Sequence, residues 1–313
     1  MIGSALLLAF AAAVGVISPR LLRSLTVMES SPRIGILSWQ LATVSAILSF
    51  ATGAGSLCLT LWSNHTPAVL VRTCFDLVAQ GDVDSPMILV GSAGVFAAAA
   101  VSLRIAYCAG RAARAIRRER SRLRRGLAVV ARCDPAWPGT VVIDRPEATA
   151  FCLPGRRGGT VVLSTGALSR LSPPEVQTVL AHERAHLQGH HDVVVWAAQS
   201  LREAFPFVPL FTAAAAALPG LVEMAADDVA SRASSRRVLA FALLRMADVT
   251  APASSMGVGG SAISRRVRRL LQPTPSGRVR RTAAVAVGVI LLVAPMATFA
   301  SAVTAGCRLG MTS

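Results

Sequence analysis

The chain contains no lysine, so all 32 of its basic residues are arginine, and it has only 16 acidic residues. Charged residues make up 15% of the 313 positions and aromatic residues 5%, whereas apolar residues make up 53%. Because a soluble domain carries about 25% charged residues, this composition argues against an ordinary soluble protein. The six cysteines include no Cys-x-x-Cys pair, which argues against a metal site built from thiolates.

Four uncharged apolar runs stand out in the sequence. Since a helix needs about 20 apolar residues to cross a bilayer, we predict a multi-pass α-helical membrane protein with about four transmembrane helices. The first run lacks a basic segment before it and an obvious small-residue cleavage site after it, so we interpret it as a retained span and not as a signal peptide. The runs are residues 2–18, 34–62, 87–103 and 282–306.

Fifteen of the 32 arginines flank one block of the chain, eight at positions 111 to 125 and seven at 265 to 281. The positive-inside rule places that block in the cytoplasm and both termini outside the plasma membrane. We therefore predict three parts: 1–110 with three spans, 111–281 as a cytoplasmic domain, and 282–313 as the fourth span with a short outer tail. Arginines beside spans favour contact with anionic lipid, and we expect no direct binding of nucleic acid.

The cytoplasmic block opens with three short segments rich in β-branched and apolar residues, 140-TVVI-143, 148-ATAFC-152 and 160-TVVLS-164. A helix is predicted to follow from Ser172, because Pro173 suits a first helical turn and Glu175 completes a capping box. Strands followed by a capped helix indicate an α+β domain inserted between the third and fourth spans.

The predicted helix carries the sequence His-Glu-x-x-His at residues 182–186. His182 and His186 are four residues apart, so both imidazoles project from one face of the helix, at the separation that two nitrogen ligands of one tetrahedral zinc ion require. Glu183 is placed to accept a proton from a zinc-bound water and pass it to a leaving amine. The alternative is a surface helix with incidental histidines, which the capped amphipathic context disfavours.

A catalytic zinc site needs a third protein ligand. His190 lies two turns from His182, about 12 Å along the helix axis, which is too far for one ion. Glu223 is the better candidate, because it belongs to the first acidic cluster after the histidines. A new helix is predicted to start at the break Pro219-Gly220, and Asp227, one turn beyond Glu223, can hold the second nitrogen of a zinc-bound histidine.

His182-Glu183-x-x-His186 followed by Glu223-x-x-x-Asp227 resembles the HExxH plus ExxAD pattern of integral-membrane gluzincins. Among these the chain is most similar to the BlaR/MecR-type membrane peptidases, whose zinc domain lies in the cytoplasm between the third and fourth spans. The resemblance implies one zinc ion per chain bound by His182, His186 and Glu223. It also implies Glu183 as the general base and Asp227 as the support of a zinc-bound histidine.

The same resemblance implies a substrate, a winged-helix transcriptional repressor of the penicillinase-repressor kind, cleaved in signal transduction. It further implies that strand 160–164 is the sheet edge that receives the substrate as an added strand. No penicillin-binding domain follows the fourth span before Ser313, so we expect no β-lactam sensor. An HtpX-like quality-control protease shares both motifs and is the close alternative; a catalytically silent signalling or scaffold protein is the other.

The stretch from Ala204 to Leu221 is uncharged over 18 residues, which is long enough to be read as a span. A single crossing would separate Glu223 from His182 by the bilayer, so the zinc interpretation predicts a bent hairpin here, either buried or dipping into the membrane. Nothing identifies an oxyanion-stabilising residue, although Arg232 and Arg236 are candidates. The alternating basic and apolar residues 265–271 suit a helix lying on the inner leaflet.

Overall fold

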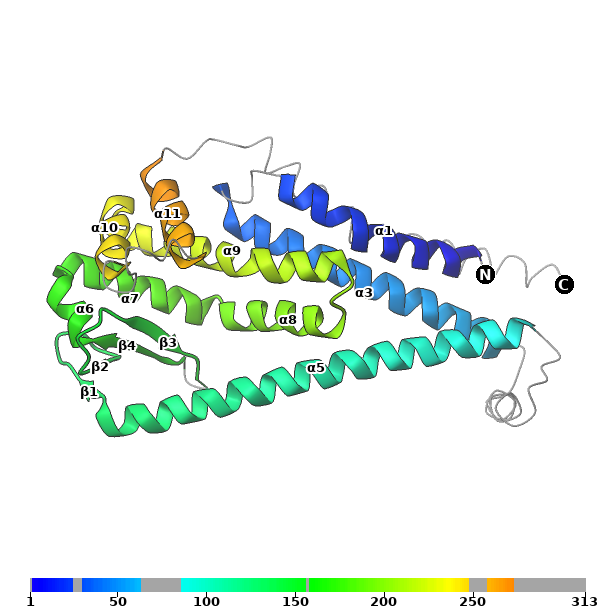
Figure 1. The fold of residues 1–313 in the computed structure, drawn as a ribbon, viewed down its shortest axis with the longest axis horizontal. Helices are drawn as coiled ribbons and strands as arrows, with labels where there is room; N and C mark the ends of the chain where they lie inside the picture. The colour runs from blue at the N-terminus through cyan, green and yellow to red at the C-terminus, as the bar shows by residue number, and fades with distance from the viewer. Residues whose placement is uncertain (1, 25–29, 63–85, 156–157, 248–257, 273–313) are drawn as a thin grey trace.

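The computed structural model describes residues 2–24, 30–62, 86–155, 158–247 and 258–272, and the predicted fourth span at 282–306 lies outside them. The molecule is elongated, with long helices at one end and a small sheet at the other (Figure 1). The strands are β1 (Arg132–Cys133), β2 (Thr140–Ile143), β3 (Ala150–Leu153) and β4 (Thr160–Ser164). The helices are α1 (Ile2–Ser24), α3 (Pro32–Trp62), α5 (Pro86–Val130), α6 (Thr165–Arg170), α7 (Pro173–Gln188), α8 (His191–Ala204), α9 (Pro209–Ala233), α10 (Arg236–Ala247) and α11 (Val258–Leu271).

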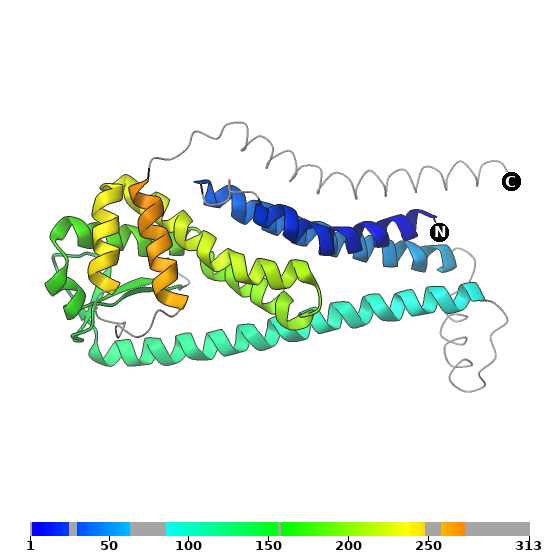
Figure 2. The same ribbon diagram turned by 45° about the horizontal axis from the view of Figure 1, so that its top comes forward.

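Two of the predicted spans are long apolar helices, α1 and α3, which lie side by side and run in opposite directions (Figures 1 and 2). The third predicted span, 87–103, is the first part of α5, which continues without a break to Val130. Three helical segments of the described chain are long and apolar enough to cross a membrane: Gly3–Ser24, Pro32–Ser56 and Pro209–Ala233. The predicted helical class with membrane-spanning segments is therefore supported. By length and composition, however, the segments found among the described residues include Pro209–Ala233 and do not include the predicted span at 87–103.

The third of those segments, in α9, belongs to a hairpin and not to a crossing. Residues 205–208 turn the chain back, so that α8 and the first half of α9 run antiparallel beside each other (Figures 1 and 2). Within α9, 61% of the apolar window is buried inside the protein, as expected for a core helix. The bent hairpin that the zinc interpretation required is therefore present.

The predicted helix break at Pro219-Gly220 is wrong, because α9 continues through it to Ala233. A proline inside a helix displaces the carbonyl four residues earlier from its hydrogen bond. Here that carbonyl belongs to Ala215, and the Gln199 side chain of α8 donates to it over 3.5 Å. The neighbouring helix thus supplies the lost partner, so the helix is preserved.

The hairpin shares one hydrophobic core with the membrane-type helices α1, α3 and α5. On α3, Trp39 and Ala42 are almost fully buried, and on α9 so are Leu210 and Ala213. Runs of alanine on α9 have short side chains and allow the helix axes to approach closely. The α8–α9 hairpin is therefore packed onto these helices and is not joined to them by a loop alone.

The sheet has the strand order β1-β2-β4-β3, in which β2 and β4 are parallel and the outer pairs are antiparallel. The predicted strands at 140–143 and 160–164 have the observed limits. The strand predicted at 148–152 is observed at 150–153. However, β4 pairs on both sides, so the prediction that it is the substrate-binding edge is wrong. Its run Val161-Val162-Leu163 is fully buried, as is typical of a central strand. The edge strand beside the helices is β3.

Helix α7 begins as predicted, with a capping box in which the backbone N–H of Ser172 donates to the Glu175 carboxylate over 2.7 Å. It packs against the sheet on one side and against α9 on the other. Helix α11 was expected on the membrane surface, but it lies against α10 and its buried Leu270 joins a small core with α9 and α10. The acidic residues of α9 that pair with arginines of α11, described below, explain why α11 packs against the protein.

The connection from β4 to α6 is tight at Gly166, where an added Cβ would lie 2.1 Å from the carbonyl oxygen of Pro146. We expect Gly166→Ala to lower the free energy of unfolding by about 2 kcal/mol, since the backbone must shift to relieve the clash. Gly126→Ala in α5 is the matched control, because nothing lies within 4 Å of its added Cβ, and it should stabilise the helix slightly. Denaturant unfolding in detergent measures both; equal effects would contradict the clash.

Candidate metal centre

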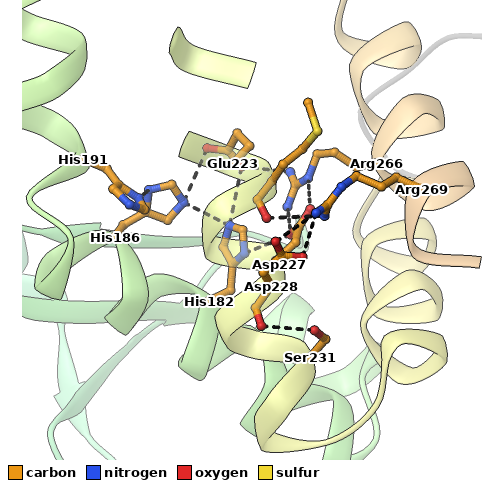
Figure 3. A network of polar contacts seen from close by, with 10 residues as sticks. His182, His186, His191, Glu223, Asp227, Asp228, Ser231, Arg266 and Arg269 are labelled. Carbon is orange, nitrogen blue, oxygen red and sulfur yellow. Dashed lines mark hydrogen bonds and ion pairs between the residues drawn. The ribbon is translucent and has the colours of Figure 1, made fainter. Parts of the chain in front are cut away.

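Three potential ligands converge where α7 crosses α9 (Figure 3). The Nε2 atoms of His182 and His186 lie 3.1 Å apart. The carboxylate of Glu223 on α9 reaches both, with one oxygen 3.4 Å from Nε2 of His182 and the other 3.4 Å from Nε2 of His186. Residues 41 positions apart along the sequence, on two separate helices, thus present their ligand atoms to a common point.

These separations fit a tetrahedral zinc ion. Two ligand atoms that are each bound at about 2.0–2.1 Å with a tetrahedral angle between them lie about 3.3 Å apart, close to the observed 3.1 and 3.4 Å. Two imidazoles and one carboxylate are also a donor set that zinc prefers and leave a fourth position for water. The residues present therefore suit a zinc ion with an open coordination position.

The buried carboxylate of Asp227 supports His182 from behind. Its Oδ1 lies 3.1 Å from Nδ1 of His182, although the ring N–H does not point at that oxygen closely enough to make a hydrogen bond. A histidine that binds a metal through Nε2 needs a partner for its Nδ1–H, since this fixes the tautomer and the ring orientation. Asp227 is in position to be that partner after a small rotation of the ring.

Arg266 of α11 joins the two carboxylates of α9 (Figure 3). Its guanidinium donates two hydrogen bonds to Asp227, of 2.8 and 2.6 Å, and pairs with Glu223 at 2.9 Å. One turn further along α11, Arg269 pairs with both oxygens of Asp228 at 2.8 Å. These contacts hold α11 on α9 and fix the side chain of Glu223 from the side opposite the histidines.

The charges of this network set opposite protonation states for the two histidines. Burial alone would lower the pKa of His182, but the carboxylates of Asp227 and Glu223 outweigh it and raise the pKa to about 9. For His186 burial prevails over the single nearby carboxylate of Glu223, and its pKa falls to about 4. Without metal at neutral pH, the site therefore holds one imidazolium and one neutral imidazole.

Glu183 faces the same cleft from α7. Burial raises its pKa above the ordinary value, and the charge of His182 only partly opposes this. A carboxylate with a raised pKa is a better proton acceptor near neutral pH. Next to it on β3, burial and the Glu183 charge raise the pKa of Cys152 to about 12, so this thiol is protonated at neutral pH.

His191 also belongs to the site. Helix α7 stops at Gln188, and His190 adopts a left-handed conformation with a φ of 47°. This turn brings Nδ1 of His191 to 3.1 Å from Nδ1 of His186. Each of the two histidine ligand candidates thus has a group 3.1 Å from its Nδ1 atom, Asp227 for His182 and His191 for His186.

A cleft of about 1080 Å³ opens over these residues. One wall is the edge strand β3, and another is the part of α5 beyond its apolar run, through Ile116, Glu119 and Leu123. Helices α9, α10 and α11 complete it, with apolar side chains such as Leu243 and Ile263. The cleft therefore combines an unpaired strand edge, apolar walls and the candidate metal ligands.

Comparison with known families agrees with this geometry. The model of Peptidase family M48 matches residues 115–280, which is more than half of the chain and includes every site residue described above. The chain belongs to peptidase family M48. Together with its apolar helices, this makes it a membrane metallopeptidase. No solved structure matches the chain significantly.

The structure of this M48 peptidase brings His182, His186 and Glu223 together and sets Asp227 behind them, as the two sequence motifs predicted. Of the two arginines suggested for the oxyanion, Arg236 donates to the carbonyl of Arg269, and Arg232 is exposed near the end of α9. The cation at the site is Arg266, which the sequence indicated only as part of a topology signal. Arg266 and Arg269 are three positions apart, and the apolar residues Val267 and Leu270 are also three positions apart. This spacing places all four side chains toward the side of α11 that faces the protein.

Arg266 should control metal affinity. We expect Arg266→Gln to weaken zinc binding by about 10-fold to 100-fold, since supporting groups around a metal ligand have effects of that size. The neighbouring Arg265 is exposed, so Arg265→Gln is the matched control and should bind zinc normally. Competition with a chromophoric chelator measures both. An unchanged affinity in Arg266→Gln would show that Glu223 is held by other contacts.

The two histidines should titrate far apart in the metal-free peptidase. We expect the imidazole of His182 to lose its proton near pH 9 and that of His186 near pH 4. Because the pKa of His182 is raised, its ion pair with Asp227 adds stability below about pH 6.5 in full and loses it as the pH rises through 9. Imidazole NMR shifts, assigned with single-histidine variants, measure both values. Titration of either ring near pH 6.5 would contradict the network.

Proposed function

We propose that the chain is a membrane-embedded zinc endopeptidase with one zinc ion per chain, held by His182, His186 and Glu223. The observation that carries this proposal is the convergence of three ligand atoms at separations of 3.1 to 3.4 Å in a family M48 domain. The resemblance of the two motifs to those of integral-membrane gluzincins supports zinc as the metal.

The proposed mechanism assigns a role to each residue around that ion. A zinc ion held by His182, His186 and Glu223 would polarise the scissile carbonyl and lower the pKa of a bound water molecule. Glu183 accepts the proton of the attacking water and passes it to the leaving amine. Asp227 holds the ring of His182, and Arg266 keeps the carboxylate of Glu223 aimed at the ion. The substrate backbone adds to the free edge of β3, which aligns it across the cleft.

We propose that this chemistry occurs in the cytoplasm. The chain is then divided into three spans within 1–110, the peptidase domain at 111–281, and the fourth span with an outer tail at 282–313. The arginines on α5 and α11 support this orientation, since the positive-inside rule assigns them to the cytoplasmic side. Both termini then lie outside the plasma membrane.

The proposed substrate is a winged-helix transcriptional repressor, cleaved to transmit a signal as in the BlaR/MecR-type peptidases. The resemblance in topology and in both motifs supports this choice. The second candidate is an HtpX-like quality-control role, which the wide cleft favours, because an exposed strand edge recognises extended backbone of many sequences. A catalytically silent scaffold is the third, and the complete set of His182, Glu183, His186 and Glu223 argues against it.

Metal binding and catalysis should be separable by mutation. We expect Glu183→Gln to retain about one zinc per chain and to lose at least about 10²-fold to 10⁴-fold in cleavage rate, because the proton acceptor is removed while the ligands remain. His182→Ala should lose the metal itself. Zinc content and cleavage of a casein substrate measure the two properties. Undiminished cleavage by Glu183→Gln would remove Glu183 from the proposed role.

The substrate class is tested by co-expression with the winged-helix repressor from the neighbouring reading frame, where one is encoded. Cleavage of that repressor by the wild type and not by Glu183→Gln supports signalling. Cleavage of unfolded membrane proteins with the repressor intact would favour quality control instead.

A further inference from the structure

The turn of the α8–α9 hairpin lies near the ends of the apolar runs of two predicted spans, α1 and α5. On α5, Arg104 is the first charged residue after the apolar run 87–103, and its guanidinium donates to the carbonyl of Ala204 at the end of α8. On α1, the apolar run ends at Ser18, and Gly15 lies 3.6 Å, measured from an added Cβ, from Val208 of the turn. The turn 205–208 therefore sits where two independent spans end.

The turn itself is apolar and faces outward. Phe207 is 76% exposed, and its ring stands beside that of Phe205 with the centroids 6.0 Å apart. Near the turn, Ile17 of α1 and Leu103 of α5 are also exposed apolar side chains. An exposed phenylalanine that continues the apolar surface of membrane helices is expected to contact lipid acyl chains and not water.

The charged end of α8 sets the limit of this contact. Arg202 and Glu203 are exposed and lie directly before the turn, and Glu203 pairs with Arg111 of α5 at 2.6 Å. Exposed charges are costly in hydrocarbon, so the body of the hairpin lies outside the bilayer and only its turn reaches in.

We infer that the turn 205–208 inserts into the adjacent leaflet and that the metal centre stands about 20 Å outside the bilayer. Glu223 lies fourteen positions after Pro209 on α9, and at a rise of about 1.5 Å per residue the two are roughly 21 Å apart along the helix axis. Helix α9 runs along the same long axis as the spans in both views (Figures 1 and 2), so this length measures depth. The hairpin thus acts as a spacer between membrane and active site.

This distance restricts the substrate, on the basis of the proposed peptidase function. The scissile bond must lie in an aqueous polypeptide segment and not within a transmembrane helix. For a substrate that is itself anchored in the membrane, a span of about 20 Å requires at least about six extended residues between the anchor and the bond, at about 3.3 Å per residue. Soluble substrates meet no such requirement.

The depth is tested without reference to activity. Phe207→p-benzoylphenylalanine and Phe241→p-benzoylphenylalanine are compared in the full chain, reconstituted in phosphatidylglycerol and phosphatidylethanolamine vesicles and irradiated. Both side chains are exposed, by 76% and 55%, but Phe241 lies on α10, beside the site. We expect a phospholipid adduct in the intact mass at position 207 and none at 241. Absence of the adduct at 207, or equal adducts at both, overturns the inference.

The restriction on substrate is tested with a casein segment that the reconstituted wild type cleaves when it is free in solution. The segment is fused to a membrane anchor through spacers of 0 to 15 residues. We expect cleavage to fall at least 10-fold when fewer than about six residues separate anchor and bond, and cleavage independent of spacer length overturns the proposed distance. Loss of cleavage of free casein as well would count against the peptidase function, so the two failures are distinguishable.

Discussion

The site depends on one buried carboxylate. Asp227 is fully inaccessible to solvent, and burying an isolated charge costs several kcal/mol unless it is paired and hydrogen-bonded. It is compensated from two sides, by the guanidinium of Arg266 on α11 and by the ring of His182 on α7. Three helices that are distant in sequence must therefore take one mutual arrangement for this charge to be stable. That arrangement also brings Glu223 to the two histidines.

A second constraint is that α9 remains one continuous helix through Pro219. Its first half packs in the hydrophobic core beside α1 and α3, and its second half carries the acids of the metal centre. A kink at Pro219 would change the angle between these halves, and the metal ligand would move with it. The hydrogen bond from Gln199 of α8 to the freed carbonyl of Ala215 keeps the helix continuous. Packing at the membrane end and geometry at the metal end are thus transmitted along a single straight element.

These two constraints explain which features the sequence predicts and which it does not. Local patterns predicted the capping box at Ser172, strands β2 and β4, and the pairing of His182 with His186, because each depends on residues within a few positions of one another. The order of the strands depends on contacts across the sheet, so the edge was assigned to the wrong strand. Likewise, the helix through Pro219 is preserved by a residue on another helix, which no local pattern contains.

The roles of Arg266 and His191 do not follow from the sequence, for a related reason. Both lie in segments whose composition had a sufficient local explanation, a basic run before a span and a cluster at a helix end. Their roles arise only from tertiary contacts, the pairs with Asp227 and with His186. Where one residue type occurs many times in a segment, the sequence does not indicate which of those residues makes the functional contact. Arg266 and His191 are distinguished from other residues of their type by their tertiary contacts, and these are properties of the fold.

The arginines of α5 have a structural role. Successive arginines along this helix contact the rest of the domain at increasing distance from its apolar run at residues 87–103. Arg104 and Arg111 bind the end of α8, Arg120 pairs with Asp192 at its beginning, and Arg124 donates to the carbonyl of Pro154 at the end of β3. Because α5 is one continuous helix from its apolar run to the sheet, these contacts fix the position of β3 relative to the apolar end of the helix. The arginines of α5 therefore position the cleft, and a form of the domain without α5 would lose one wall of the site.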